Sequence, residues 1–190
     1  MSALKSNRLK GLLIAAAVLA ADLAVKAMVM GPWALRTQPQ GQIELLPFFR
    51  LTFTQNFGVS LGMFTADSAE MRWGLVALTL TIAIVVFVWL LKEKKMGDIA
   101  ALGLVLGGAL GNIRDRTLYG YVIDYADLHF GNFRPFLIFN IADAAISIGV
   151  VIILARALFL REKRPEKSGG GESDNPETSG PEPVGTAETK

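Results

Sequence analysis

The stretch GLVALTLTIAIVVFVWLL, residues 74–91, decides the class of this protein. It carries no charged side chain, and its length approaches the roughly 20 apolar residues that a helix needs to cross the hydrocarbon core of a bilayer. We therefore expect a transmembrane helix here.

Three further apolar segments accompany it, at about residues 11–30, 98–116 and 138–160. The first is too long and too interrupted by charge for a cleaved signal peptide. The sequence thus predicts an all-α polytopic membrane protein with four transmembrane helices, in one domain over residues 1–164. The connecting segments 31–72 and 117–137 are expected on the outer face.

Composition excludes several kinds of chemistry. The 190 residues are 52% hydrophobic and 19% charged, with no cysteine and one histidine, His129. A chain without cysteine has no disulfide framework, thiol nucleophile or cysteine–metal site, and one histidine cannot build a His-rich metal site. We expect no cofactor, no metal and no nucleic-acid partner, and chemistry that relies mainly on Asp, Glu, Lys, Ser and Asn.

Basic residues predict the topology. They cluster before the first predicted helix, between the second and third, and after the fourth, for example at Lys10, Lys92 and Arg161. Cytoplasmic loops are enriched in Lys and Arg, so these clusters are expected on the cytoplasmic side, with both termini. The net charge of +2 combines this basic body with an acidic tail, residues 165–190, whose polar composition predicts disorder.

The first connecting segment is expected to contain regular structure. Residues 49–54, FRLTFT, alternate apolar and polar side chains, which is the period of a half-buried strand. We expect a small strand-containing element on the outer face, and Asp67 as the cap of the second helix.

Polar side chains gather at the outward ends of the predicted helices. An ionised side chain at the bilayer centre costs about 2.5–3.5 kcal/mol, so such residues indicate function. In the third helix, Asn112, Asp115 and Arg116 lie on one face, because they are spaced at i, i+3 and i+4. The set comprises Asp22 and Lys26; Asn56 after the predicted strand; Asn112, Asp115 and Arg116; Asp124 and Asp127 in a predicted loop; and Asn140 and Asp143.

Two carboxylates held close together can share one proton, so that one acts as a base toward water while the other stays protonated. Such a pair hydrolyses an amide without His, Cys or metal. The spacing leaves open which two of four aspartates meet: Asp115, Asp124, Asp127 and Asp143.

Simpler interpretations apply to several of these residues. Asp115 is expected to pair with Arg116, and Asp22 with Lys26. Gly103, Gly107 and Gly111 are spaced by four, which predicts close helix packing. A Ser60–Lys26 nucleophilic dyad is disfavoured, because no spacing supports it.

Four motifs in order along the chain resemble those of the lipoprotein signal peptidases (signal peptidase II), the bacterial membrane aspartic endopeptidases. They are the D-x-x-x-K of residues 22–26, NFGVSLGMF of 56–64, GGALGNIRDR of 107–116 followed by GYVIDY of 120–125, and FNIADAAISIG of 139–149.

The resemblance implies an inner-membrane enzyme that removes the signal peptides of prolipoproteins just before a diacylglyceryl-modified cysteine, with its site near the outer face. It implies Asp124 and Asp143 as the catalytic pair. The residues that would bind substrate or support the site are Asn56, Asn112, Asp115, Arg116, Asn140, Asp22 and Lys26. We expect membrane lipid as a partner and a monomer as the active form.

The alternative is a small proton- or ion-coupled carrier that uses Asp22, Asp115 and Asp143 as a relay. A relay requires carboxylates spread through the thickness of the membrane, whereas the sequence places most of them at one end.

Overall fold

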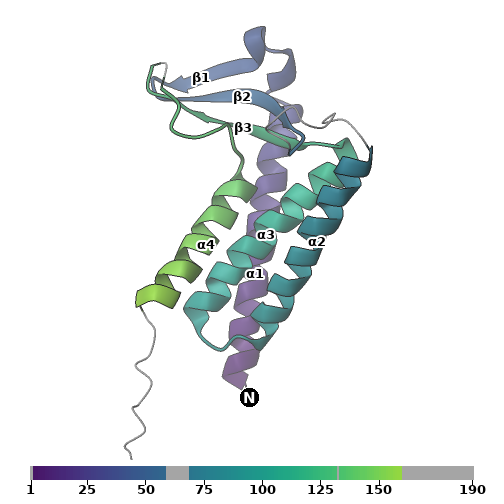
Figure 1. Cartoon of the computed structure of the whole chain (residues 1–190). Coiled ribbons are helices and arrows are strands. Elements are labelled where there is room, and N and C mark those ends of the chain that lie inside the picture. Colours follow the sequence, from purple (N-terminus) through teal and green to yellow (C-terminus); the bar gives the residue numbers. More distant parts are fainter. Residues whose placement is uncertain (1, 59–68, 132, 160–190) are drawn as a thin grey trace, which may run out of the picture.

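The computed structural model describes residues 2–58, 69–131 and 133–159 (Figure 1). Four helices dominate it: α1 (Ser2–Met30), α2 (Ala69–Lys92), α3 (Met96–Tyr119) and α4 (Ile141–Phe159). Each is long and apolar enough to cross a bilayer, which confirms the prediction of four transmembrane helices. The expected cap at Asp67, the Ser60 of the disfavoured dyad and the acidic tail lie outside the described residues.

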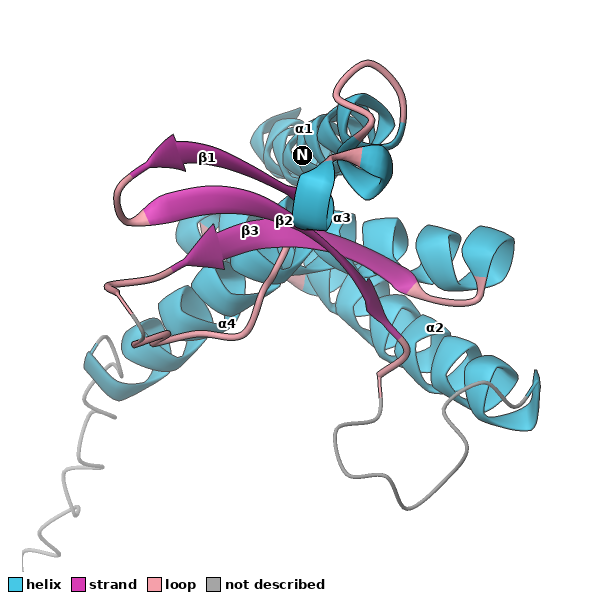
Figure 2. Cartoon of the chain, turned by 90° about the horizontal axis from the view of Figure 1, so that it is seen from above, coloured by secondary structure: helices cyan, strands magenta, loops and turns pink. Residues whose placement is uncertain are grey.

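Helix α3 lies at the centre of the bundle and contacts each of the other three helices (Figures 1 and 2). Its glycines make this possible. A Cβ on Gly103 would stand 2.5 Å from the carbonyl oxygen of Gly11 in α1, and one on Gly107 would stand 2.5 Å from that of Ala15. The predicted close packing at these glycines is therefore confirmed, because any side chain would push the two helices apart.

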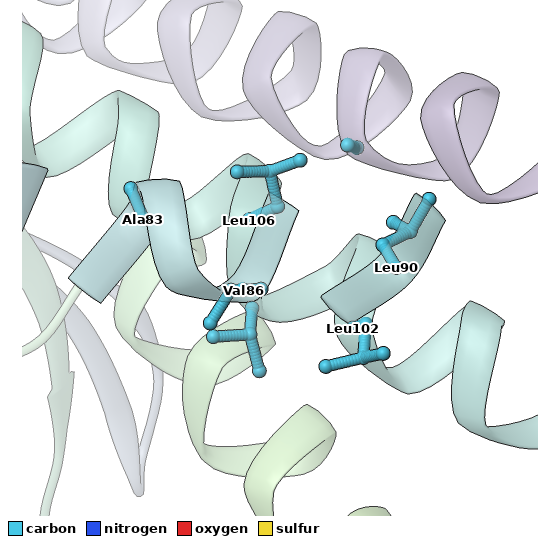
Figure 3. Packing of buried hydrophobic residues seen from close by; sticks show 7 residues of the cluster. Ala83, Val86, Leu90, Leu102 and Leu106 are labelled. Atoms are coloured by element: carbon cyan, nitrogen blue, oxygen red, sulfur yellow. The ribbon is translucent and has the colours of Figure 1, made fainter. Parts of the chain in front are cut away.

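The contact between α2 and α3 is made of aliphatic side chains. Figure 3 shows Ala83, Val86 and Leu90 of α2 against Leu102 and Leu106 of α3, all of them buried. Large apolar side chains on the outer surfaces of the helices stay exposed, among them Val85 and Leu154. This distribution suits a bundle whose outer surface faces lipid tails.

A three-stranded antiparallel sheet caps one end of the bundle, in the order β1 (Gln42–Leu46), β2 (Phe49–Asn56), β3 (Val122–Leu128) (Figure 1). Two short 3-10 turns, Leu35–Thr37 and Pro39–Gly41, lead from α1 into β1. The predicted strand at residues 49–54 is confirmed as part of β2.

The third strand corrects a prediction. Residues 122–128 form β3, where the sequence suggested a loop, so Asp124 and Asp127 lie on a strand. Six of its seven residues are buried, and a strand buried on both faces lacks the alternation by which strands are recognised.

The sheet rests on the end of the bundle through apolar side chains. Val29 of α1, Leu35 of the following turn, Leu51 of β2 and Ile123 of β3 belong to one buried cluster. The N-terminus, the α2–α3 connection and the last turn of α4 lie at the opposite end of the bundle (Figure 1).

Candidate active site

Two carboxylates, Asp124 on β3 and Asp143 in the first turn of α4, are joined by asparagine side chains. The amide nitrogen of Asn140 donates to Asp124 Oδ1 at 2.7 Å, and that of Asn112 donates to Asp143 Oδ1 at 2.7 Å. Asn140 Nδ2 also lies 3.3 Å from Asn112 Oδ1. One hydrogen-bond chain therefore links both carboxylates across β3, α3 and α4.

Local structure explains how Asp143 reaches this position. Asn140 directly precedes α4, and its Oδ1 accepts a hydrogen bond from the backbone N–H of Asp143 at 2.9 Å. This is the geometry of an N-cap, in which a short polar side chain satisfies a free N–H of the first turn. The same asparagine thus starts the helix with one end of its amide and holds Asp124 with the other.

Asn56, the last residue of β2, completes the surroundings of Asp124. Its Nδ2 donates to Asp124 Oδ2 at 2.9 Å, and its Oδ1 accepts from the backbone N–H of Gly58 at 2.8 Å. Both oxygens of Asp124 therefore accept a hydrogen bond from an asparagine amide. Pairing between β2 and β3 sets this contact, since Thr54 of β2 lies opposite Asp124.

The surroundings of Asp124 favour its protonated form. Burial, with the side chain only 1% exposed, and then the negative charge of Asp143 raise its pKa to about 6, although the bonds from Asn56 and Asn140 act in the opposite direction. A carboxyl group in such surroundings keeps its proton to a higher pH than a solvent-exposed aspartate does.

Arg116 supplies positive charge to the same place. Its half-buried guanidinium interacts electrostatically with Asp143 and Asp124. It also lies beside Gly58, where a Cβ would stand 3.5 Å from Arg116 Nη2. Arg72 at the start of α2 holds the backbone here, because its guanidinium donates to the carbonyl oxygens of Arg116, at 2.7 Å, and of Thr117.

A second ionic group lies deeper in the bundle. Lys26 Nζ is 2.8 Å from Asp22 Oδ2 and 2.7 Å from Asp115 Oδ2, and all three side chains are at most 2% exposed. We call these residues the Lys26 triad. The predicted Asp22–Lys26 pair is confirmed. The predicted Asp115–Arg116 pair is wrong, since Asp115 lies against Lys26, with Arg114 Nη1 farther away at 3.6 Å.

The triad holds the backbone immediately before each carboxylate of the site. Asp22 Oδ1 accepts a hydrogen bond from the N–H of Ala142 at 3.1 Å, and Asp115 Oδ2 accepts one from the N–H of Ile123 at 3.2 Å. Ile123 precedes Asp124, and Ala142 precedes Asp143. Lys26 therefore connects the two backbone segments that carry these carboxylates.

Asp127, the remaining candidate, belongs to a different group. Its Oδ2 accepts hydrogen bonds from Arg50 Nε at 2.8 Å and from Thr52 Oγ1 at 3.1 Å, and Arg134 Nη2 lies 3.3 Å away. Burial by itself would raise its pKa, but these hydrogen bonds and positive charges outweigh burial and lower it. Asp127 is thus an ionised, paired carboxylate of the sheet.

Two hollows meet at the site. A cavity of about 530 Å³ is lined by Asp124, Asn56, Arg134 and neighbouring residues, and an apolar groove of about 270 Å³ contains Asp143, Ser147 and Ile148. Phe136 and Leu137 line both, and they are 62% and 84% exposed. Each hollow thus contains one carboxylate of the linked pair.

Sequence reasoning missed Arg134 and Arg72. Neither lies in a periodic pattern, and only the fold brings them to the site. Within the described residues, no group of three His, Asp or Glu side chains could hold a metal ion.

Comparison with known proteins identifies relatives over most of the chain. A family model described as signal peptidase (SPase) II matches residues 14–159. The lipoprotein signal peptidase of Sphingopyxis alaskensis is 51% identical over 164 residues, which cover 86% of this chain and 94% of that protein. The lipoprotein signal peptidase of Yersinia enterocolitica is 36% identical over 151 residues, 78% of this chain and 86% of the relative.

A solved structure agrees with these relatives. It is that of a bacterial membrane enzyme, which superposes with a TM-score of 0.65 at 29% identity and covers 79% of this chain and 93% of its own.

Proposed function

Because this chain belongs to the signal peptidase II family, and is thus a membrane peptidase that removes signal peptides from prolipoproteins, we propose that Asp124 and Asp143 are its catalytic pair. The observation that carries this proposal is the asparagine chain that joins these two carboxylates. The other two candidates have partners of their own, Asp115 in the Lys26 triad and Asp127 in the sheet.

In the proposed mechanism, Asp124 holds the proton that the pair shares, since it is the more buried of the two. Asp143 takes a proton from a water molecule, whose oxygen attacks the carbonyl carbon of the scissile amide. Asp124 gives its proton to the carbonyl oxygen. The tetrahedral intermediate then collapses: the C–N bond breaks, the leaving amine takes up the proton from Asp143, and the hydroxyl that becomes the carbonyl of the new carboxylic acid returns its proton to Asp124.

The surrounding residues have supporting roles. Asn56 and Asn140 orient Asp124, and Asn112 orients Asp143. The positive charge of Arg116 would stabilise the negative charge that develops on the substrate's carbonyl oxygen. The Lys26 triad fixes the two backbone segments, so that the carboxylates keep their separation while substrate binds.

We further propose that the sheet lies at the outer face of the membrane and that both termini lie in the cytoplasm. This is supported by Lys92, Lys94 and Lys95, which follow α2 at the end of the bundle opposite the sheet. A diacylglyceryl-modified precursor would then enter from the bilayer along the apolar groove beside Asp143, and a monomer would be sufficient for cleavage.

The test is cleavage by the purified protein of a diacylglyceryl-modified precursor and, separately, of its unlipidated form. We expect cleavage of the lipidated form only. Asp124→Asn and Asp143→Asn are each expected to lower kcat by about 10²–10⁴-fold, the usual contribution of a positioned acid or base. Asp98→Asn is a matched control, because Asp98 pairs with Arg156 near the opposite end of the bundle. Normal turnover by either site variant would remove that residue from the pair.

The carrier alternative has less support. Two members of its relay, Asp22 and Asp115, share Lys26 as an ion-pair partner. Proton-driven flux of a solute into liposomes that contain the protein would be evidence for the carrier.

A further inference from the structure

Arg134 stands in the cavity beside Asp124 without a part in the proposed reaction. It belongs to the segment between β3 and α4, and its side chain is 47% exposed. Among the described residues that line the cavity, only Asp124 and Arg134 are charged. Arg134 is therefore the positive group of this part of the lining.

Arg134 is one of two arginines beside the buried carboxylate of Asp127, and the other, Arg50, also pairs with Glu44. Asp127 is fully buried, and its Oδ2 accepts hydrogen bonds from Arg50 at 2.8 Å and from Thr52 at 3.1 Å. Arg134 approaches the same oxygen with one nitrogen, at 3.3 Å. A guanidinium has five N–H donors, and the ion pair that Arg134 makes within the described residues engages only Nη2, which leaves donors for a ligand in the cavity. Asp127 then acts as the anchor that keeps the side chain in place.

The position of the cavity indicates which part of a substrate would meet Arg134. The groove beside Asp143 is apolar and runs along α4, so it suits the membrane-embedded part of a peptide. The cavity beside Asp124 lies against β2, and Thr54, Gln55 and Asn56 give it a polar side. A peptide whose scissile bond lies between the two aspartates would continue from the groove into this cavity.

We propose that this cavity is a subsite for the mature portion of the substrate, in which Arg134 selects a carboxylate side chain within the first residues after the modified cysteine. This inference rests on the proposed function. The attraction has a physical reason: Arg134 is the positively charged residue among the described lining residues of the cavity, and a guanidinium binds a carboxylate with two parallel hydrogen bonds.

The experiment uses the full-length protein in detergent and diacylglyceryl-modified peptides that differ at one residue. Asp, Ser or Lys is placed in turn at each of the three positions after the modified cysteine, and kcat/KM is measured. At one position or more, Asp is expected to be preferred over Lys by about twofold to fivefold, the upper part of the range for an exposed ion pair. The preference is expected to decrease with added salt.

Variants of Arg134 test whether this side chain causes the preference for an acidic residue. Arg134→Gln is expected to abolish it and Arg134→Glu to invert it, while the Ser peptide is still cleaved; Arg134→Lys is expected to retain part of it. Arg36→Gln is the matched control, since Arg36 is also exposed at the sheet end but does not line the cavity.

The outcomes separate the two proposals. If the unaltered protein cleaves none of the lipidated peptides, the proposed function fails. If it cleaves Asp and Lys peptides equally well at every position, or if Arg134→Gln leaves the preference unchanged, only the subsite is overturned. A preference that follows the charge of added phospholipid instead of the peptide would assign Arg134 to lipid headgroups and would equally overturn the proposal.

Discussion

Replacing Lys26 by Met is expected to destabilise the protein strongly. Lys26 Nζ lies between Asp22, at 2.8 Å, and Asp115, at 2.7 Å, and water cannot take its place because all three side chains are at most 2% exposed. Methionine has a similar length but no charge. Removal of one partner from a buried ion pair costs about 3–5 kcal/mol, because the remaining charge stays buried without compensation.

This loss is large compared with the total stability. Since 1.4 kcal/mol corresponds to a factor of ten, the folding equilibrium is expected to shift by roughly a hundredfold to several thousandfold. The free energy of unfolding of a native protein is about 5–15 kcal/mol, so a folded population should remain. Its activity is also expected to fall, because the anchors on Ile123 and Ala142 depend on the same triad.

The assay is thermal unfolding of the purified protein in detergent, followed by the fluorescence of its three tryptophans. Lys10→Met is the matched control, since it is the same substitution on the same helix at an exposed position; surface changes of this kind stay within about 0.5 kcal/mol. The double variant Lys26→Met/Asp115→Asn is expected to recover part of the loss, as one uncompensated charge is removed. Equal unfolding temperatures for Lys26→Met and Lys10→Met would refute the structural role of the triad.

Three further predictions concern single contacts. The pKa of Asp124 is about 6 with the hydrogen bond from Asn56 in place, and this bond lowers it, so Asn56→Ala is expected to raise that pKa and to move the alkaline limb of the kcat/KM profile to higher pH. An unchanged limb contradicts the assignment of Asp124 as the protonated partner. Gly111→Ala places a Cβ 2.6 Å from a carboxylate oxygen of the Lys26 triad and should cost about 1–3 kcal/mol by thermal unfolding, whereas Gly74→Ala, whose Cβ meets no described atom within 4 Å, should cost nothing. Asp127 has a lowered pKa in the folded protein, so it stabilises above the unfolded value of about 3.9 and loses this contribution as pH falls; the unfolding temperatures of Asp127→Asn and the unaltered protein should differ at pH 7 and converge below about pH 4.

Residue spacing along one helix predicts the contacts within that helix, but it does not predict the contacts between helices. Asp22 and Lys26 are four residues apart, so their side chains meet on one helix face, as the structure confirms. Asp115 and Arg116 are adjacent in sequence, but neighbouring side chains on a helix point in different directions. Asp115 therefore reaches Lys26 of α1, and Arg116 turns toward Asp143 and Asp124.

The strand β3 could not be predicted from the sequence for a second reason. Its residues are buried almost throughout, so no alternation of polar and apolar side chains marks it, whereas the half-exposed β2 was predicted. The burial of β3 follows from its place between β2 and the ends of the helices, which no local pattern records.

The four transmembrane helices and the concentration of polar residues at one end can be read from the sequence, because hydropathy and charge act along short segments of the chain. Which carboxylates share a hydrogen-bond network, and which are neutralised by a cation, depends on the folded arrangement of the helices and strands. That choice depends on distances between α1, α3, α4 and β3, and those distances follow from the glycines that let α3 approach α1 and from the strand pairing that brings Asn56 to Asp124.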